Sequence, residues 1–417
     1  MGDRTRIVVL AAIVLGVVGG VALWTGVDGG PDELPAATDV FPAPEHWPGI
    51  QWNRVEEPAL EARGSALYGV TNHGAWLVGW GEIPVPDPAA EGGFRATAAL
   101  WTSRGGVGWQ VHELRLVTGL PFFAQTLAVG PAGYLAFGTH GGGDLLARVA
   151  SSPDGRRWAE AGRQPLDSGA LLVATPTGFV TAGLKAARPM VLSTSDGVAW
   201  EEIAVPAGAG DYALSDVHPT ADGIIVSGRV QRARDWDGVI WRTAAGGAWD
   251  DLAGRHPLFT GPDRGVAIWR TVPFAGGIFA LGSAGEVPDC MLVGLVASLG
   301  PVIADHCGCP PEAAWTSRDG RAWREVKGPR PEAIRFSMFN AITAGAAGLV
   351  AIIEEAPIAA DKSHLGFWTS GDGVEWSRIG DAMPGNAGGN LVGLAGRIVV
   401  LGSTDNGIAV WVGTPGG

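Results

Sequence analysis

Short β-rich apolar runs that begin at or next to a glycine recur along most of the chain. Their seven positions are 74–81, 133–138, 178–183, 223–228, 277–282, 348–353 and 396–402. A further apolar segment precedes each run, as at 67–70 before the first and 391–394 before the last. Runs of this length bounded by glycine are typical of strands joined by tight turns. The pattern therefore predicts a series of antiparallel strand pairs.

A nine-residue phrase returns six times between these pairs and predicts a second hairpin in each unit. Its copies are 101–109, 150–158, 192–200, 241–249, 315–323 and 368–376, of which the clearest reads WTSRDGRAW. A unit of two hairpins that repeats every roughly 40 to 50 residues indicates a β-propeller. In such a ring each four-stranded blade buries its apolar faces against its neighbours.

The number of strands closes the ring only if the two ends of the chain share a blade. The seventh unit stops after 409–412, one strand short, whereas 50–58 matches the outer strand of the other units. We therefore predict an all-β, seven-bladed β-propeller of four-stranded antiparallel blades over 49–417. Trp52 would complete the last blade beside Trp411 and so leave no exposed strand edge at the break.

The N-terminal segment reads as a membrane anchor. An uncharged apolar run of 18 residues, 7–24, follows Arg4 and Arg6. At 1.5 Å per residue a helix of this length spans about 27 Å, close to the thickness of a bilayer core. Basic residues before the run indicate that 1–6 form a cytoplasmic stub. The alternative is a cleaved signal peptide, because 20–22 offer small residues at a suitable position.

The next segment, 25–48, is rich in proline, glycine and acidic residues and has no apolar periodicity. Such a composition is typical of a linker that holds a folded domain away from a membrane. We expect a single-pass protein of the cell membrane with the propeller on the extracytoplasmic side. Cleavage of the apolar run would make the protein secreted instead.

Charge and motifs limit the classes of partner. The formal net charge of −13 argues against a nucleic-acid partner, which would require a basic face. The sequence contains no phosphate-binding loop, no GxSxG elbow and no HExxH helix. We therefore expect no cofactor.

The nine-residue phrase resembles the Asp-box, the hairpin motif of BNR-like repeats in propellers of the sialidase and sortilin type. Ser152, Asp154, Gly155 and Trp158 carry the resemblance in one copy, with a spacing one residue shorter than the usual motif. The corresponding acids of the other copies are Asp196, Asp319 and Asp372, whereas two copies have Gly105 and Ala245 instead. A carboxylate in a tight turn can accept bonds from backbone N–H groups, so we interpret these aspartates as structural.

The two ends of the ring differ in regularity. Turns within the hairpins all lie on one end, here called the turn face. The connections between the two hairpins of a blade, and between blades, lie on the other end, here called the loop face. Its long connections are expected at 82–95, 229–238, 283–311 and 354–366. Because function tends to reside in loops on a rigid scaffold, the loop face is the candidate binding surface.

One of these connections, 283–311, holds every cysteine of the chain. Outside the cytoplasm we expect a disulfide from Cys290 to either Cys307 or Cys309, with the remaining thiol free or paired between chains. A metal site is the alternative, since His306 lies beside these thiols and Asp289 precedes the first of them.

The Asp-box resemblance also raises the chemistry of sialidases, which use a tyrosine nucleophile with a glutamate partner, an arginine triad and an acid/base aspartate. Candidate residues are Tyr68, Arg270 and Arg335, in or near predicted inner strands. The Phe/Tyr-Arg-Ile-Pro signature of that family is absent, and sialidases have six blades.

We therefore expect a membrane-tethered binding or scaffolding module for a protein, an envelope glycan or a small ligand. The alternatives are a glycoside hydrolase of the exo-alpha-sialidase type and an assembly factor for a membrane complex.

Overall fold

The computed structural model describes residues 50–415, which belong to the larger of two compact units, Pro35–Gly417. Gaps in this description are 91, 141–146, 221–222, 233–234, 245–247, 255, 262–264, 286–311, 328–333, 346–347, 358–363, 380–388, 395 and 405–406. The predicted anchor and linker, 7–24 and 25–48, lie outside the described residues. Among the described residues no helix is long and apolar enough to cross a membrane.

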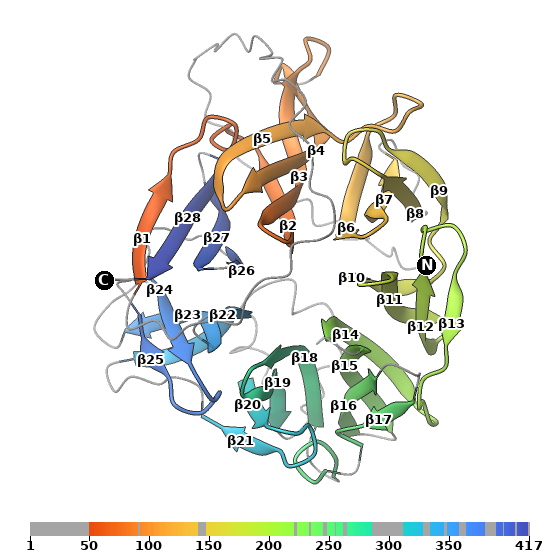
Figure 1. Ribbon diagram of the computed structural model, residues 1–417, viewed down its shortest axis with the longest axis vertical. Coiled ribbons are helices and arrows are strands. Elements are labelled where there is room, and N and C mark those ends of the chain that lie inside the picture. The colour runs from red at the N-terminus through yellow and green to blue at the C-terminus, as the bar shows by residue number, and fades with distance from the viewer. Residues whose placement is uncertain are drawn as a thin grey trace, which may run out of the picture. The chain divides into compact units, whose positions relative to one another are not determined.

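Seven four-stranded antiparallel sheets surround a common axis, as Figure 1 shows. Blades 1 to 3 comprise β2 (Ala66–His73), β3 (Trp76–Pro86), β4 (Phe94–Arg104) and β5 (Val107–Glu113); β6 (Phe122–Gly130), β7 (Gly133–His140), β8 (Arg148–Ser152) and β9 (Ala159–Arg163); and β10 (Ser168–Thr175), β11 (Gly178–Lys185), β12 (Arg188–Thr194) and β13 (Glu201–Ile203).

Blades 4 to 7 follow in chain order. They comprise β14 (Asp211–Thr220), β15 (Gly223–Arg232), β16 (Asp235–Ala244) and β17 (Trp249–Asp251); β18 (Gly265–Phe274), β19 (Gly277–Gly285), β20 (Glu312–Ser317) and β21 (Arg324–Val326); β22 (Ile334–Gly345), β23 (Gly348–Pro357), β24 (His364–Ser370) and β25 (Ser377–Arg378); and β26 (Gly389–Leu394), β27 (Arg397–Thr404), β28 (Gly407–Pro415) and β1 (Ile50–Val55).

The predicted seven blades and the closure by the N-terminal strand are both confirmed. β1 pairs antiparallel with β28, with Trp52 opposite Gly413 and Arg54 opposite Trp411. Trp52 packs against the apolar cluster that contains Trp411, and its ring centroid lies 4.2 Å from that of Phe367 in blade 6. The two ends of the chain thus share one blade, and the first strand also ties that blade to its neighbour.

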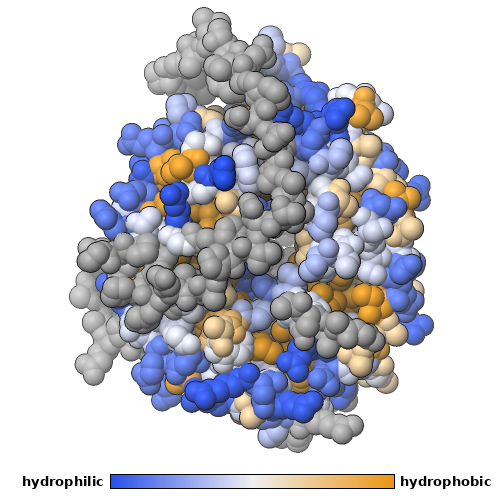
Figure 2. Space-filling model, viewed as in Figure 1, coloured by the Kyte–Doolittle hydropathy of each residue, from blue (hydrophilic) through white to orange (hydrophobic). Residues whose placement is uncertain are grey.

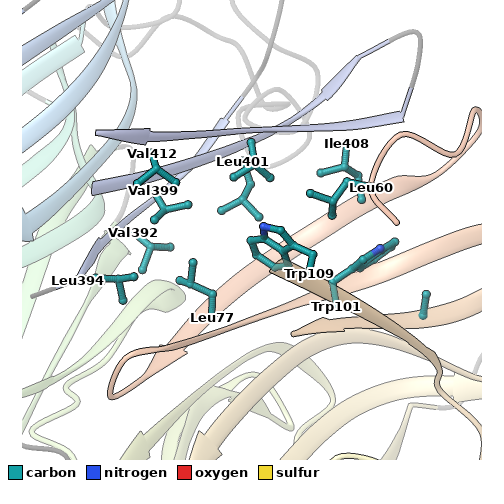
Figure 3. Packing of buried hydrophobic residues seen from close by; sticks show 12 residues of the cluster. Leu60, Leu77, Trp101, Trp109, Val392, Leu394, Val399, Leu401, Ile408 and Val412 are labelled. Atoms are coloured by element: carbon teal, nitrogen blue, oxygen red, sulfur yellow. The ribbon is translucent and has the colours of Figure 1, made fainter. Parts of the chain in front are cut away.

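Apolar faces of successive blades form the core. Between blades 7 and 1, the side chains of Leu77, Trp101 and Trp109 pack against Val399 and Leu401, as Figure 3 shows. Trp101 is fully buried, and similar clusters fill other interfaces between blades. Because each blade is apolar on both faces, the ring is held together by the burial of blade against blade.

Strand pairing extends into the expected long connections at 82–95, 229–238 and 354–366, so these connections are shorter than predicted. Pairing continues to Pro86↔Phe94, to Arg232↔Asp235 and to Glu355↔His364. The fourth connection, 283–311, begins with the last residues of β19, and 286–311 lie outside the described residues.

These strands extend further than their composition suggests, because polar residues and prolines are tolerated where a strand has a neighbour on one side only. Beyond the pair Ala66↔Glu82, β3 has β4 on one side only, so Pro84 and Pro86 lie on an open edge that needs no N–H donor. In blade 4 the guanidinium of Arg229 stacks 4.0 Å from the ring centroid of Trp236. This cation–π contact stabilises a hairpin whose sequence looks like a loop.

Candidate functional site

The aspartates of the repeated phrase hold their own turns on the turn face. The Oδ1 of Asp319 accepts hydrogen bonds from the backbone N–H groups of Arg321 at 2.8 Å and Ala322 at 2.9 Å, and from the hydroxyl of Ser317 at 3.1 Å. The indole N–H of Trp323 donates to the carbonyl of the turn glycine at 2.8 Å. A single carboxylate oxygen therefore organises the whole turn.

The other three acidic copies repeat this geometry. Their Oδ1 atoms accept backbone N–H bonds of 2.9 and 2.9 Å at Asp154, 2.8 and 3.1 Å at Asp196, and 2.8 and 3.0 Å at Asp372. The glycine after each acid has a positive φ, between 71° and 78°. Because the same turn recurs in four blades, we interpret these aspartates as structural and not as parts of a single functional site.

These bonds make one contribution to stability that depends on pH. The backbone N–H groups of Ala322 and Arg321 lower the pKa of Asp319 from 3.8 to about 2. A pKa that is lower in the folded chain adds stability above the unfolded value, and this contribution is lost as the pH falls through the folded value. We expect the unfolding free energy of the Asp319→Asn variant to decline less between pH 4 and pH 2 than that of the wild type.

Chemical denaturation at each pH measures this difference. Asp211→Asn, at an exposed aspartate at the start of β14, is the matched control and should follow the wild-type curve. Parallel curves for the wild type and Asp319→Asn would show that the turn bonds do not favour the ionised carboxylate.

The innermost strands carry a feature that the sequence analysis missed. In six blades the first strand has a β-bulge, a single extra residue that breaks the register with the second strand. Besides a second break at Arg335 near the start of β22, the residues at these breaks are Tyr68, Gln125, Ala170, Ser215, Trp269 and Asn340. Each lies five residues before the last residue of its strand. The bulges therefore stand at one level around the ring.

Five of these six residues bear side chains that can contact a ligand, and together they are called the bulge ring. Its members are Tyr68, Gln125, Ser215, Trp269 and Asn340. Tyr68 is 50% exposed, Trp269 is half-buried, and the other three are exposed. Because the first strand is the innermost of each blade (Figure 1), exposed side chains on it gather near the axis.

Close backbone approach fixes the bulges. A Cβ added at Gly81 would lie 1.9 Å from the carbonyl oxygen of Ala66, and one at Gly282 would lie 2.0 Å from that of Ala267. Only glycine fits at these two positions, so the second strands of blades 1 and 5 are adapted to their bulges. The bulge ring therefore stands on a preformed backbone.

Two carboxylates each bind the bulged first strand of the next blade. Asp216, next to the bulge of blade 4, accepts the backbone N–H of Thr271 in blade 5 at 2.8 Å and its hydroxyl at 3.2 Å. Glu312 in blade 5 accepts the backbone N–H of Phe339 in blade 6 with both oxygens at 3.1 Å. Each carboxylate therefore fixes the strand segment that carries the next bulge residue.

Burial shifts the pKa of one titratable group beside the ring and of one ring member. Burial lowers the pKa of His218, against the effect of the Asp216 carboxylate, and the charge of Arg270 lowers it too. In blade 1, burial and the carboxylate of Glu82 raise the pKa of Tyr68. At neutral pH, the imidazole is therefore uncharged and the phenol keeps its proton.

The sequence-predicted catalytic candidates lie in three different blades. Tyr68 is in β2, Arg270 in β18 and Arg335 in β22. No hydrogen bond or ion pair joins Tyr68 to Arg270 in the part of the chain that the structure describes. Two of the candidates touch the bulge ring nevertheless, since Tyr68 is a member and Arg270 follows Trp269.

The predicted disulfide and the alternative metal site both lie outside the described residues. Asp289, Cys290, His306, Cys307 and Cys309 all lie within 286–311. Among the residues that are described, no group of three or more His, Cys, Asp and Glu side chains could hold a metal ion.

The missed residues share a sequence signal. Gln125, Ser215, Trp269 and Asn340 each stand eight residues before the glycine that begins the second strand of their blade. Tyr68 stands eight residues before Trp76, the first residue of β3. Alignment of the repeats on those strand starts would have brought the ring into one column.

Comparisons with known proteins show no family for this chain. No protein-family model and no curated protein sequence matches the chain. Among solved structures, it is similar to streptogramin B lyase, with 14% identity, a TM-score of 0.45 and coverage of 88% of this chain and 99% of that one. It is also similar to TolB from Acinetobacter baumannii, with 11% identity, a TM-score of 0.33 and coverage of 82% and 81%.

A third solved structure is a subtype N10 neuraminidase-like protein of A/little yellow-shouldered bat/Guatemala. Its identity to this chain is 7%, the TM-score is 0.38, and the match covers 70% of this chain and 95% of that one. Similarities of this extent carry no argument about a ligand or reaction. The chain is a seven-bladed β-propeller, and its function has to be argued from its own residues.

Proposed function

We propose that the chain is a binding module that takes its ligand at the bulge ring. The observation that carries the proposal is the convergence of five exposed or half-exposed side chains, from five blades, at one level of the innermost strands. Ligand sites combine aromatic side chains with a few well-placed polar groups, and this ring offers both.

The turn face supports the proposal by contrast. Its four aspartates bond to their own turns, and its hairpins repeat from blade to blade. A repeated surface offers no single place for a ligand, whereas the bulge ring presents a different side chain in each blade. Figure 2 shows the molecule in the view of Figure 1. On this side the described hydrophobic residues form small groups among hydrophilic ones.

We further propose that 7–24 anchor this module in the cell membrane and that 25–48 hold it on the extracytoplasmic side. The apolar run after two arginines and the proline-rich acidic segment support this arrangement. The partner would be a protein, an envelope glycan or a small ligand. A protein partner would be consistent with an assembly factor for a membrane complex.

The geometry favours hydrolysis less. The carboxylate of Glu82 lies beside Tyr68, but among the described residues no hydrogen bond or ion pair joins this pair to Arg270. Binding of a ligand, unlike hydrolysis, requires no catalytic groups beyond the side chains of the bulge ring.

Site-directed crosslinking in intact cells tests the proposal. We expect a photoreactive amino acid at position 125 of the full chain to form a crosslinked adduct, because this position is exposed on an innermost strand. The control is the same group at position 198, which is 63% exposed on the turn face. Equal labelling at both positions, or labelling at position 198 alone, would contradict the proposed site.

A further inference from the structure

We infer that the bulge ring takes a neutral, hydroxyl-rich ligand, the chemical class of an uncharged oligosaccharide. This inference rests on the proposed function and deepens it. Its basis is the combination of side chains that the bulges bring together, since none of the five carries a formal charge at neutral pH.

The five side chains match the groups of a sugar. Tyr68 and Trp269 present aromatic surfaces that can cover the apolar C–H face of a sugar ring. Gln125 and Asn340 each carry an amide, a group with both donor hydrogens and an acceptor oxygen, and Ser215 carries a hydroxyl. A sugar hydroxyl both donates and accepts, so a mixed set of donors and acceptors satisfies it where a uniform set would not.

The charges around the ring argue against an anionic ligand. Among the described side chains, three carboxylates, those of Glu82, Asp216 and Glu312, lie beside ring residues, whereas Arg270 supplies one positive charge. The fixed charge next to the ring is therefore negative. An anion would be repelled, in a chain whose net charge is already −13.

These carboxylates are poorly placed to hold a cation, since Glu82 already bonds to the phenol of Tyr68. Asp216 and Glu312 each accept backbone N–H groups of the next blade, so they are occupied in fixing the bulges. A cationic ligand would have to replace those bonds and leave the N–H groups without partners, which costs free energy. An uncharged ligand avoids both problems.

The backbone supports binding without rearrangement. The bulges lie on paired strands, and glycines such as Gly81 and Gly282 permit their close approach to the second strand. Side chains on such strands are held in place before the ligand arrives, which reduces the entropy that binding costs. Weak neutral contacts can then produce measurable affinity.

Titration calorimetry on the full chain in detergent micelles tests the inference with three probes of similar size. These are the neutral tri-N-acetylchitotriose, the cationic chitosan trimer obtained by its deacetylation, and the anionic trigalacturonate. We expect the neutral trisaccharide to bind at least tenfold more tightly than either charged one. We also expect Gln125→Ala and Trp269→Ala to weaken that binding about tenfold each, as loss of one polar or aromatic contact would.

The matched control is Trp236→Ala, which removes a half-buried tryptophan that stacks on Arg229 in a hairpin of the same fold. Its affinity for the neutral trisaccharide should equal that of the wild type. Circular dichroism confirms that each variant is folded before its affinity is interpreted, and Gln125→Ala at an exposed position keeps the test valid if Trp269→Ala does not fold.

Three results would overturn the inference. Tighter binding of either charged probe would assign the ring to another ligand class. Binding of the neutral probe that is unaffected by Gln125→Ala would place the sugar elsewhere. Absence of binding by all three probes, together with crosslinking at position 125, would reject the ligand class while the proposed function stands. Absence of both would reject the proposed function as well.

Discussion

Deletion of residues 48–58 is expected to destabilise the whole propeller, because it removes the strand that closes the ring. β1 pairs with β28 from Ile50↔Pro415 to Val55↔Val410, and Trp52 packs against Phe367 of the neighbouring blade. Loss of a packed tryptophan alone costs on the order of 3 kcal/mol, and the loss of a full strand ladder adds to this. We expect the unfolding free energy to fall by at least about 4 kcal/mol.

Urea unfolding followed by tryptophan fluorescence measures this effect. The matched control is deletion of residues 1–40, which removes the predicted anchor, leaves β1 in place, and should give a folded, soluble protein with the unfolding midpoint of the propeller. The open edge of β28 should also make the 48–58 deletion aggregate, which light scattering detects. Equal midpoints for the two deletions would mean that β1 does not hold the ring closed.

The blade pattern could be predicted because it depends on local chemistry. Five of the predicted turn glycines, at 133, 178, 223, 277 and 348, are the first residues of β7, β11, β15, β19 and β23. Glycine and the apolar run that follows it determine a turn and a strand within a few residues. The closure could also be predicted, because a missing outer strand at one end matched an extra strand at the other.

Hairpin lengths could not be predicted in the same way. The segments with Pro84 and Pro86, or with Arg229 and Asp235, look like loops because local composition favours turns there. Their pairing depends on which side of the strand has a neighbour and on cross-strand contacts such as the stack on Trp236. Neither is visible in one strand's sequence.

The candidate site depends on register even more strongly. A bulge arises where two strands pair out of step, so a single residue such as Gln125 or Ser215 has no local mark of its own. Tyr68 and Arg270 were singled out for their chemistry, and only the structure shows that they stand at and beside one ring. Comparison among the repeats was the available signal, because six of the seven repeats share the same register break.

The second large effect is expected at the glycines that begin the second strands. At Gly178 the backbone has φ of 151°, and an added Cβ would lie 2.3 Å from the carbonyl oxygen of Thr194. At Gly162 the φ is 149°, yet an added Cβ would meet nothing within 4 Å. The two positions share their φ angle and differ in the space around them.

Substitution by alanine therefore separates backbone strain from steric conflict. Both variants should lose about 1 to 2 kcal/mol from the unfavourable φ. Gly178→Ala should lose about 2 kcal/mol more, because its methyl group displaces the end of the third strand from the second. Urea unfolding of both variants measures the difference, and equal losses would show that the close approach is not required.

The same contact recurs in other blades, which makes the result general. An added Cβ would lie 2.4 Å from the carbonyl oxygen of Ser152 at Gly133, 2.1 Å from that of Ser317 at Gly277, and 2.5 Å from that of Ser370 at Gly348. Each of these carbonyls belongs to the residue that opens an Asp-box-like turn. A large loss at Gly178 would therefore mean that in these four blades the turn glycine and the repeated phrase form two halves of one contact, which pairs the second strand with the third.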